Sequence, residues 1–87
     1  MSGNPTKVDG LDINECLDGY VIYDQRRDRV HFLNYTAVMV LQLCNGEFSP
    51  DEIADMMRRA YALDEVPTDL VLSALKQLHE EGLIQSA

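Results

Sequence analysis

The sequence predicts an α+β fold, with a three-stranded antiparallel sheet in the first half of the chain and three helices in the second. Two observations predict this order. Residues 11–33 are rich in β-branched and aromatic side chains and are interrupted by polar turns, whereas residues 34–84 contain helix caps and apolar residues at helical spacing. A chain of 87 residues has room for one domain, so all six elements should share one core.

Three short strands are expected. Residues 11–16 alternate weakly between apolar and polar side chains, residues 20–23 are all β-formers, and residues 29–33 form the third run. Gly19 and the polar residues 24–28 supply the turns, and Gly19 is free to adopt a positive φ. Because both connections are short, the strands should pair as an antiparallel meander.

The first helix is expected directly after the third strand. Asn34 is a good N-cap, and residues 36–44 then contain only one strongly polar side chain after the first. The valines in this run leave a strand as the alternative, but the cap and the length of the run favour a helix. A helix that is apolar nearly all round belongs in the centre of a domain. Gly46 ends it, in a position that suits the left-handed conformation.

The second helix has the clearest start. Ser49-Pro50-Asp51-Glu52 combines a cap, a proline at the first helical position and the acid of a capping box. Apolar residues follow at helical spacing as far as Tyr61.

The third helix should begin at Pro67 or Thr68, after a linker, and should end at Gly82. Its core stripe consists of Val71, Ala74, Leu75 and Leu78. Leu83 and Ile84 then return to the core, in an extended conformation.

The N-terminal segment 1–10 has no periodic apolar pattern, so we expect a disordered tail ahead of a domain that spans residues 11–87. Its start lacks the apolar stretch of a secretory signal. No apolar run approaches the roughly 20 residues that cross a bilayer. Cys16 and Cys44 are therefore expected as free thiols of a cytoplasmic protein.

The charge of the chain argues against nucleic acid. The net charge is −8 and the pI is about 4.4, whereas contact with phosphates needs a basic surface. The charge is also uneven. Residues 1–44 carry four basic and six acidic residues, a net charge of −2, and residues 45–87 carry three and nine, a net charge of −6. The first half is thus the less repulsive place for an acidic partner.

No catalytic signature is present in the sequence. It contains no phosphate-binding glycine loop, no nucleophile elbow and no Cys-x-x-Cys pair, and His31 and His79 lie far apart without a second ligand at metal-binding spacing. We therefore expect a protein that is not an enzyme and that has no cofactor and no metal.

A DNA-binding regulator is the alternative function. Two helices joined by a short linker, with strands as a wing, would form a winged helix-turn-helix-like domain. The third helix, however, holds Asp69, Lys76, Glu80 and Glu81, so the face that would meet the DNA is net acidic. We expect the winged arrangement without binding of nucleic acid.

Recognition of a peptide remains. A short meander leaves unpaired edges, to which an extended peptide can add as a further strand. The third strand, residues 29–33, is the candidate because it follows the basic residues Arg26 and Arg27. Val30 and Phe32 share one face of it, and packing against the core is their first interpretation, which leaves backbone pairing along the edge possible.

A set of motifs between Gly19 and Ile84 is similar to those of a known family. The matching segments are residues 20–24, residues 29–34, Asn45-Gly46, residues 48–53 and the ending of residues 75–84 with its two leucines and Gly-Leu. In these segments the chain resembles the PqqD family, named from the synthesis of the coenzyme pyrroloquinoline quinone. Its members are also called precursor-peptide recognition elements of ribosomally made, modified peptides.

The resemblance implies a winged helix-turn-helix-like fold and a non-catalytic role. It implies that a precursor's leader peptide binds as an added strand between the third strand and the third helix. It implies delivery of that peptide to a modifying enzyme, such as a radical enzyme, a cyclase or a protease. By position, the pairing strand would consist of Arg29, Val30, His31, Phe32 and Leu33, and the groove wall of Asp69, Leu72, Ser73 and Lys76.

Overall fold

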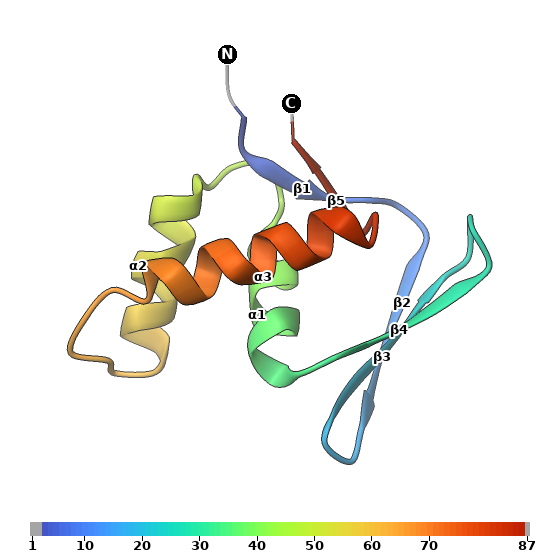
Figure 1. Ribbon diagram of the computed structural model, residues 1–87, viewed down its shortest axis with the longest axis horizontal. Coiled ribbons are helices and arrows are strands. Elements are labelled where there is room, and N and C mark those ends of the chain that lie inside the picture. The colour runs from blue at the N-terminus through green and yellow to red at the C-terminus, as the bar shows by residue number, and fades with distance from the viewer. Residues whose placement is uncertain (1–2, 87) are drawn as a thin grey trace.

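A computed structural model of the chain describes residues 3–86, and the side chains of residues 3–85. The helices gather on one side and the three-stranded sheet projects from them (Figure 1). The elements, in chain order, are β1 (Pro5–Lys7), β2 (Leu11–Cys16), β3 (Gly19–Asp24), β4 (Arg29–Leu33), α1 (Tyr35–Leu43), α2 (Pro50–Ala60), α3 (Thr68–Glu80) and β5 (Ile84–Ser86).

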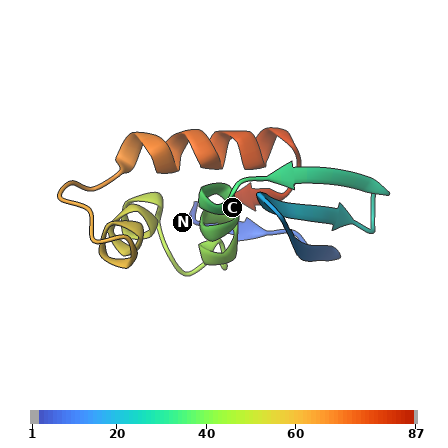
Figure 2. The same cartoon turned by 90° about the horizontal axis from the view of Figure 1, so that it is seen from below.

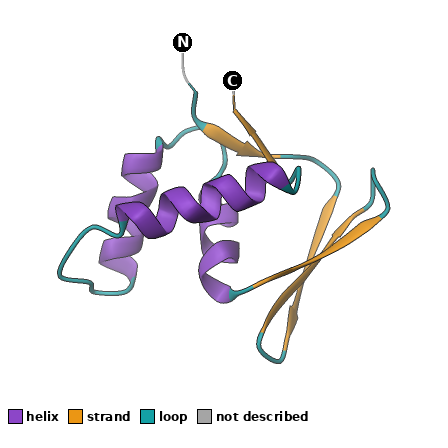
Figure 3. Ribbon diagram, viewed as in Figure 1, coloured by secondary structure: helices purple, strands orange, loops and turns teal. Residues whose placement is uncertain are grey.

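The predicted α+β order of three strands followed by three helices is confirmed (Figure 3). β2, β3 and β4 form an antiparallel sheet in the order β2-β3-β4, in which Ile13 pairs with Ile22 and Ile22 with His31. The likeness to a winged helix-turn-helix stays a prediction.

Residues 36–43 are helical, as the N-cap indicated. The Asn34 side chain accepts a hydrogen bond from the Ala37 amide at 2.8 Å, which satisfies one of the unpaired donors of the first turn of α1. The capping box of α2 is formed in both directions, since the Glu52 amide donates to Ser49 Oγ and the Ser49 amide donates to Glu52 Oε1. Gly82 ends α3 at a φ of 76°.

The N-terminal segment differs from the expected tail. Pro5–Lys7 forms β1 and pairs antiparallel with β5, and Lys7 donates a backbone hydrogen bond to the Cys44 carbonyl at 2.7 Å. A strand of three residues is too short for alternation to show in the sequence, and its partner lies at the other end of the chain. Residues 1 and 2 of the expected tail lie outside the described residues.

The core lies between the helices and one face of the sheet. The predicted stripe of α3 is buried, and Leu83 and Ile84 close the core behind it. The sheet contributes Ile22 and Leu33 to it, from the face that we call the core face. Within residues 3–86, no helix is long and apolar enough to cross a membrane.

Core packing of Val30 and Phe32 is a wrong interpretation. Their side chains are 67% and 56% exposed, on the solvent face of the sheet, while Leu33 is 1% exposed. The reason is the alternation of side chains along a strand, because β4 turns His31 and Leu33 to the core face and Val30 and Phe32 to the opposite face. The Phe32 ring instead lies over Gly19, the first residue of β3, and its Cζ would stand 2.9 Å from a Cβ added there.

Candidate functional site

β4 has one open edge. It is the last strand of the sheet, so β3 pairs with one side of it only. Viewed from below, the strands follow one another from β2 to β4, and β4 is the strand nearest α3 (Figure 2). The open edge of β4 therefore lies on the side of the sheet where α3 runs.

The hydrogen-bonding phase of the sheet decides which amides this edge offers. The Gln25 amide donates to the Gly10 carbonyl at 2.9 Å, next to the pair of Leu11 and Asp24. Bonded and non-bonded pairs alternate along an antiparallel ladder, so Val21 and Tyr23 use their backbone groups toward β2. The alternate residues of β3, which are Tyr20, Ile22 and Asp24, then use their backbone groups toward β4.

Within β4, these residues of β3 pair with Arg29, His31 and Leu33. The backbone groups of Val30 and Phe32 consequently point away from β3, to the open edge. No hydrogen bond to either amide from outside the ladder occurs among residues 3–86. The edge thus presents two N–H and two C=O groups that are ready to pair with an extended chain.

A hollow lies beside the end of β4, between the start of α1 and one face of α3. Its volume is about 170 Å³. The residues that line it are Asn34, Thr36, Ala37, Leu70, Ser73, Ala74 and Gln77. Leu70, Ser73 and Gln77 share a helix face because they are three or four positions apart. Leu70 is 49% exposed, so the hollow has an apolar wall that no described residue covers.

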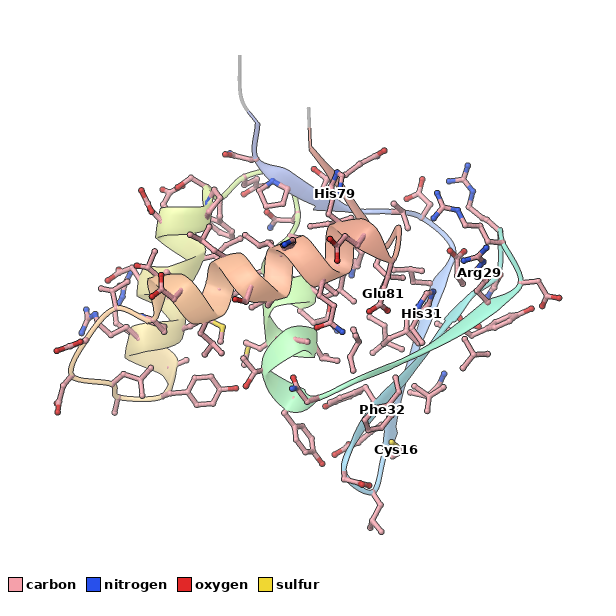
Figure 4. The ribbon with its side chains drawn as sticks, in the orientation of Figure 1. Cys16, Arg29, His31, Phe32, His79 and Glu81 are labelled. Carbon is pink, nitrogen blue, oxygen red and sulfur yellow. The ribbon has the colours of Figure 1, made fainter. Side chains whose placement is uncertain are left out.

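His31 joins β4 to the end of α3. Its Nδ1 lies 2.9 Å from Glu81 Oε1, and Figure 4 shows the two side chains pointing toward one another. Gln77 Nε2 donates to the other carboxylate oxygen of Glu81 at 2.9 Å. His31 is largely buried, and its Nε2 has no partner among the described residues. These contacts connect β4 to the C-terminal end of α3.

The sequence-predicted groove wall is divided by the structure. Ser73 lines the hollow beside β4, whereas Leu72 and Lys76 line a different hollow of about 260 Å³ with Pro5 and Ile84. The two sets of α3 residues lie on opposite flanks of the core stripe. Asp69 is exposed in the first turn of α3 and lines neither hollow.

The sequence reasoning did not assign Leu70, Gln77 or Glu81 to the peptide site, and it named Glu81 only as an acid that argues against DNA binding. Helical spacing from Ser73 points to the first two, at three positions before it and four after. The contact of Glu81 with His31 has no signal in the sequence, because Glu81 follows the last turn of α3 and meets His31 only through the tertiary fold.

The chemistry of these residues is that of binding. The described residues contain no group of three or more His, Cys, Asp or Glu that could hold a metal ion. Burial raises the pKa of the Cys44 thiol to about 11, so it is protonated at neutral pH, and its Sγ donates to the Val40 carbonyl. The site presents to a second chain an open strand edge, an apolar hollow, and the hydrogen-bonded group of His31, Glu81 and Gln77, which we call the Glu81 clasp.

One family model matches the chain. It is described as coenzyme PQQ synthesis protein D (PqqD), and it matches residues 19–84, about three quarters of the sequence. The match begins at the start of β3 and ends at the start of β5, so it includes β4, α3 and all the residues that line the hollow between α1 and α3. Neither the curated proteins nor the solved structures contain a match.

Proposed function

This chain belongs to the PqqD family, and from that premise we propose that it binds the leader segment of a precursor peptide as a strand added to β4, and delivers it to a modifying enzyme. The family has a non-catalytic, peptide-binding accessory role in the biosynthesis of PQQ and of ribosomally made, modified peptides.

The observation that supports β4 as the binding strand is the direction of its backbone. Val30 and Phe32 turn their N–H and C=O groups to the open edge, and α3 lies on that side of the sheet. A peptide that pairs there would replace water on four backbone groups. Its side chains on the core face would reach the hollow lined by Leu70 and Ser73.

The alternative edge is β2, which is also unpaired on one side. By the same alternation, Ile13 turns its backbone outward there. No residue of β2 lines any of the five hollows described on this domain, whereas the end of β4 leads into the hollow beside Leu70, so the β4 edge is the better placed for side-chain pockets. Specificity in strand addition comes from such pockets.

An NMR titration tests the proposal. The ligand is the leader segment of a precursor encoded next to this chain. The amide signals of Val30 and Phe32 should shift, and the amide of Ile13, on the other open edge, serves as the internal control. Shifts confined to β2, or no shift with any neighbouring precursor, would contradict strand addition at β4.

Delivery is tested separately, with the modifying enzyme encoded beside the precursor. If the chain delivers the peptide, modification should slow when the chain is left out, and adding back a folded variant that does not bind the peptide should fail to restore it. A radical enzyme, a cyclase or a protease would suit this role. The two free cysteines are compatible with the reducing cytoplasm in which we propose that the domain works.

A further inference from the structure

The two ends of β4 differ in charge. The turn that precedes β4 carries Arg26 and Arg27, and Arg29 opens the strand, so three of the seven basic residues of a chain with a net charge of −8 lie at one end. Arg27 is engaged, because its Nη1 donates to the Gly82 carbonyl at 3.1 Å.

The acids of the same turn offset part of this charge and leave residues 24–29 with a net charge of +1, and Asp24 stands opposite Arg29 in the ladder. Asp24 is buried, and its Oδ1 accepts hydrogen bonds from the backbone amides of Arg26 and Arg27 at 3.1 and 3.3 Å. Asp28 accepts the Tyr23 hydroxyl at 2.7 Å. Across residues 3–85, no carboxylate lies within ion-pair distance of the guanidinium group of Arg26 or Arg29. This end of β4 therefore carries a small net positive charge, and the guanidinium groups of Arg26 and Arg29 form no ion pair within residues 3–85.

The other end of β4 is apolar. Leu33 is buried in the core, and the hollow beside it is lined by Leu70, Ala37 and Ala74. No charged side chain lines this hollow. A chain running along the edge would thus leave an arginine at one end and meet an apolar wall at the other.

The register of an added strand determines how many positions of the peptide separate the residue beside the positive end of β4 from the residue beside the apolar hollow. Residues of a strand that stand opposite Arg29, His31 and Leu33 point to the same face as those side chains. Arg29 and Leu33 are four positions apart, so their opposite residues are also four apart. The residue between them, opposite His31, stands next to the Glu81 clasp.

We propose that the peptide recognised by β4 carries an acidic residue and a large apolar residue four positions apart, the acid opposite Arg29 and the apolar residue opposite Leu33, beside Leu70. This inference rests on the proposed function and names the class of peptide. In antiparallel addition the apolar residue comes first in the peptide, and in parallel addition the acid does.

The exposure of Arg29 and of Leu70 determines how much affinity the peptide should lose when its acid or its apolar residue is removed. Arg29 is exposed, and its guanidinium offers five N–H donors that match a carboxylate. A cross-strand pair of opposite charges contributes modestly in water. Loss of the acid should therefore weaken binding by about three- to fivefold. Removal of the apolar residue, which leaves the Leu70 wall uncovered, should weaken it by about tenfold or more.

The test is a selection of displayed random peptides on the full, immobilised chain. Enriched peptides should show an acid and a leucine, isoleucine or phenylalanine four positions apart, above their frequency in the starting library. One enriched peptide is then synthesised, and its dissociation constant is measured by fluorescence anisotropy, with the amides of Val30 and Phe32 followed by NMR.

Charge reversal gives the decisive comparison. Arg29→Glu should weaken binding, replacement of the peptide's acid by lysine should weaken binding to the unaltered chain, and the two changes together should restore it. Arg59→Glu is the matched control, since it makes the same change of charge on α2, away from the sheet. It should leave the affinity unchanged.

The outcomes separate the two proposals. Peptides that shift the β4 amides but lack the spaced acid, or whose affinity Arg29→Glu leaves unaltered, overturn this inference and leave strand addition in place. Selected peptides that bind elsewhere, or a selection without enrichment, overturn both.

Discussion

Gly19 is the position where one added methyl group should disturb β4. Its φ is not positive, so backbone freedom, which the turn suggested, is not what requires glycine. Glycine is required because there is no space for a side chain: a Cβ at this position would stand 2.6 Å from the Leu33 carbonyl oxygen and 2.9 Å from Phe32 Cζ. The aromatic ring can rotate, but the carbonyl belongs to the backbone of β4. Gly19→Ala should therefore push the end of β4 away from β3.

Two effects of this substitution oppose one another. Replacing glycine where alanine fits stabilises a protein by about 0.4–1 kcal/mol, because the unfolded chain loses entropy. Overpacking costs about 1–3 kcal/mol. Contact with backbone favours the upper part of that range, so the free energy of unfolding should fall by about 1–2 kcal/mol, the difference of the two.

Urea unfolding followed by circular dichroism measures this change, and a melting temperature lower by about 4–8 °C per kcal/mol should accompany it. Gly19→Ala with Phe32→Ala is the control. It removes the aromatic clash but not the contact with the Leu33 carbonyl, so it should restore only part of the loss. A Gly19→Ala chain as stable as the original, or more stable, would refute the steric argument.

Three further predictions concern single contacts. Phe32→Pro removes an outward N–H and should weaken peptide binding by about 1 kcal/mol with the domain still folded, whereas His31→Pro removes a bond of the β3–β4 ladder and should lower stability itself; anisotropy and urea unfolding separate the two. Ser49→Ala removes the cap of α2 and should cost about 1 kcal/mol in thermal unfolding, and an unchanged melting temperature would count against the capping box. The pKa of Cys44 is raised from 9.0 to about 11, so the thiol ionises more readily in the unfolded chain, and its contribution to stability should be complete below pH 9 and decline as the pH rises from 9 to 11. A Cys44→Ala chain should lack that part of the decline, and identical pH profiles would contradict it.

The sequence predicts the main elements well because their signals are local. The cap at Asn34, the capping box at Ser49 and the stripe of α3 each lie within a few residues, and the structure contains all three. β1 and β5 lack such a signal. Three residues do not establish a period, and each becomes a strand only by pairing with the other end of the chain.

The candidate site is less predictable, because it depends on which flank of α3 faces β4 and on which residues of β4 turn their backbone groups to the open edge. Leu70 and Leu72 are 49% and 50% exposed and stand on the two flanks of the same core stripe, so the sequence does not tell which flank faces β4. The outward direction of the Val30 and Phe32 backbone is likewise set by the bonding phase between β2 and β3, a property of the assembled sheet. The strand itself, residues 29–33, is predicted with the bounds that the structure gives.

The pairing of β1 with β5 determines how the domain can be joined to itself or to another protein. Pro5 lies opposite Ser86, so the two ends of the described chain leave side by side, as Figure 1 shows. The hollow that Pro5 lines is on the flank of α3 opposite the one beside β4. A short linker could join the ends into a circle, and the domain could equally be inserted in a loop of a larger protein. In either form, the open edge of β4 would still be accessible, so the proposed strand addition could be tested in a circular or an inserted domain.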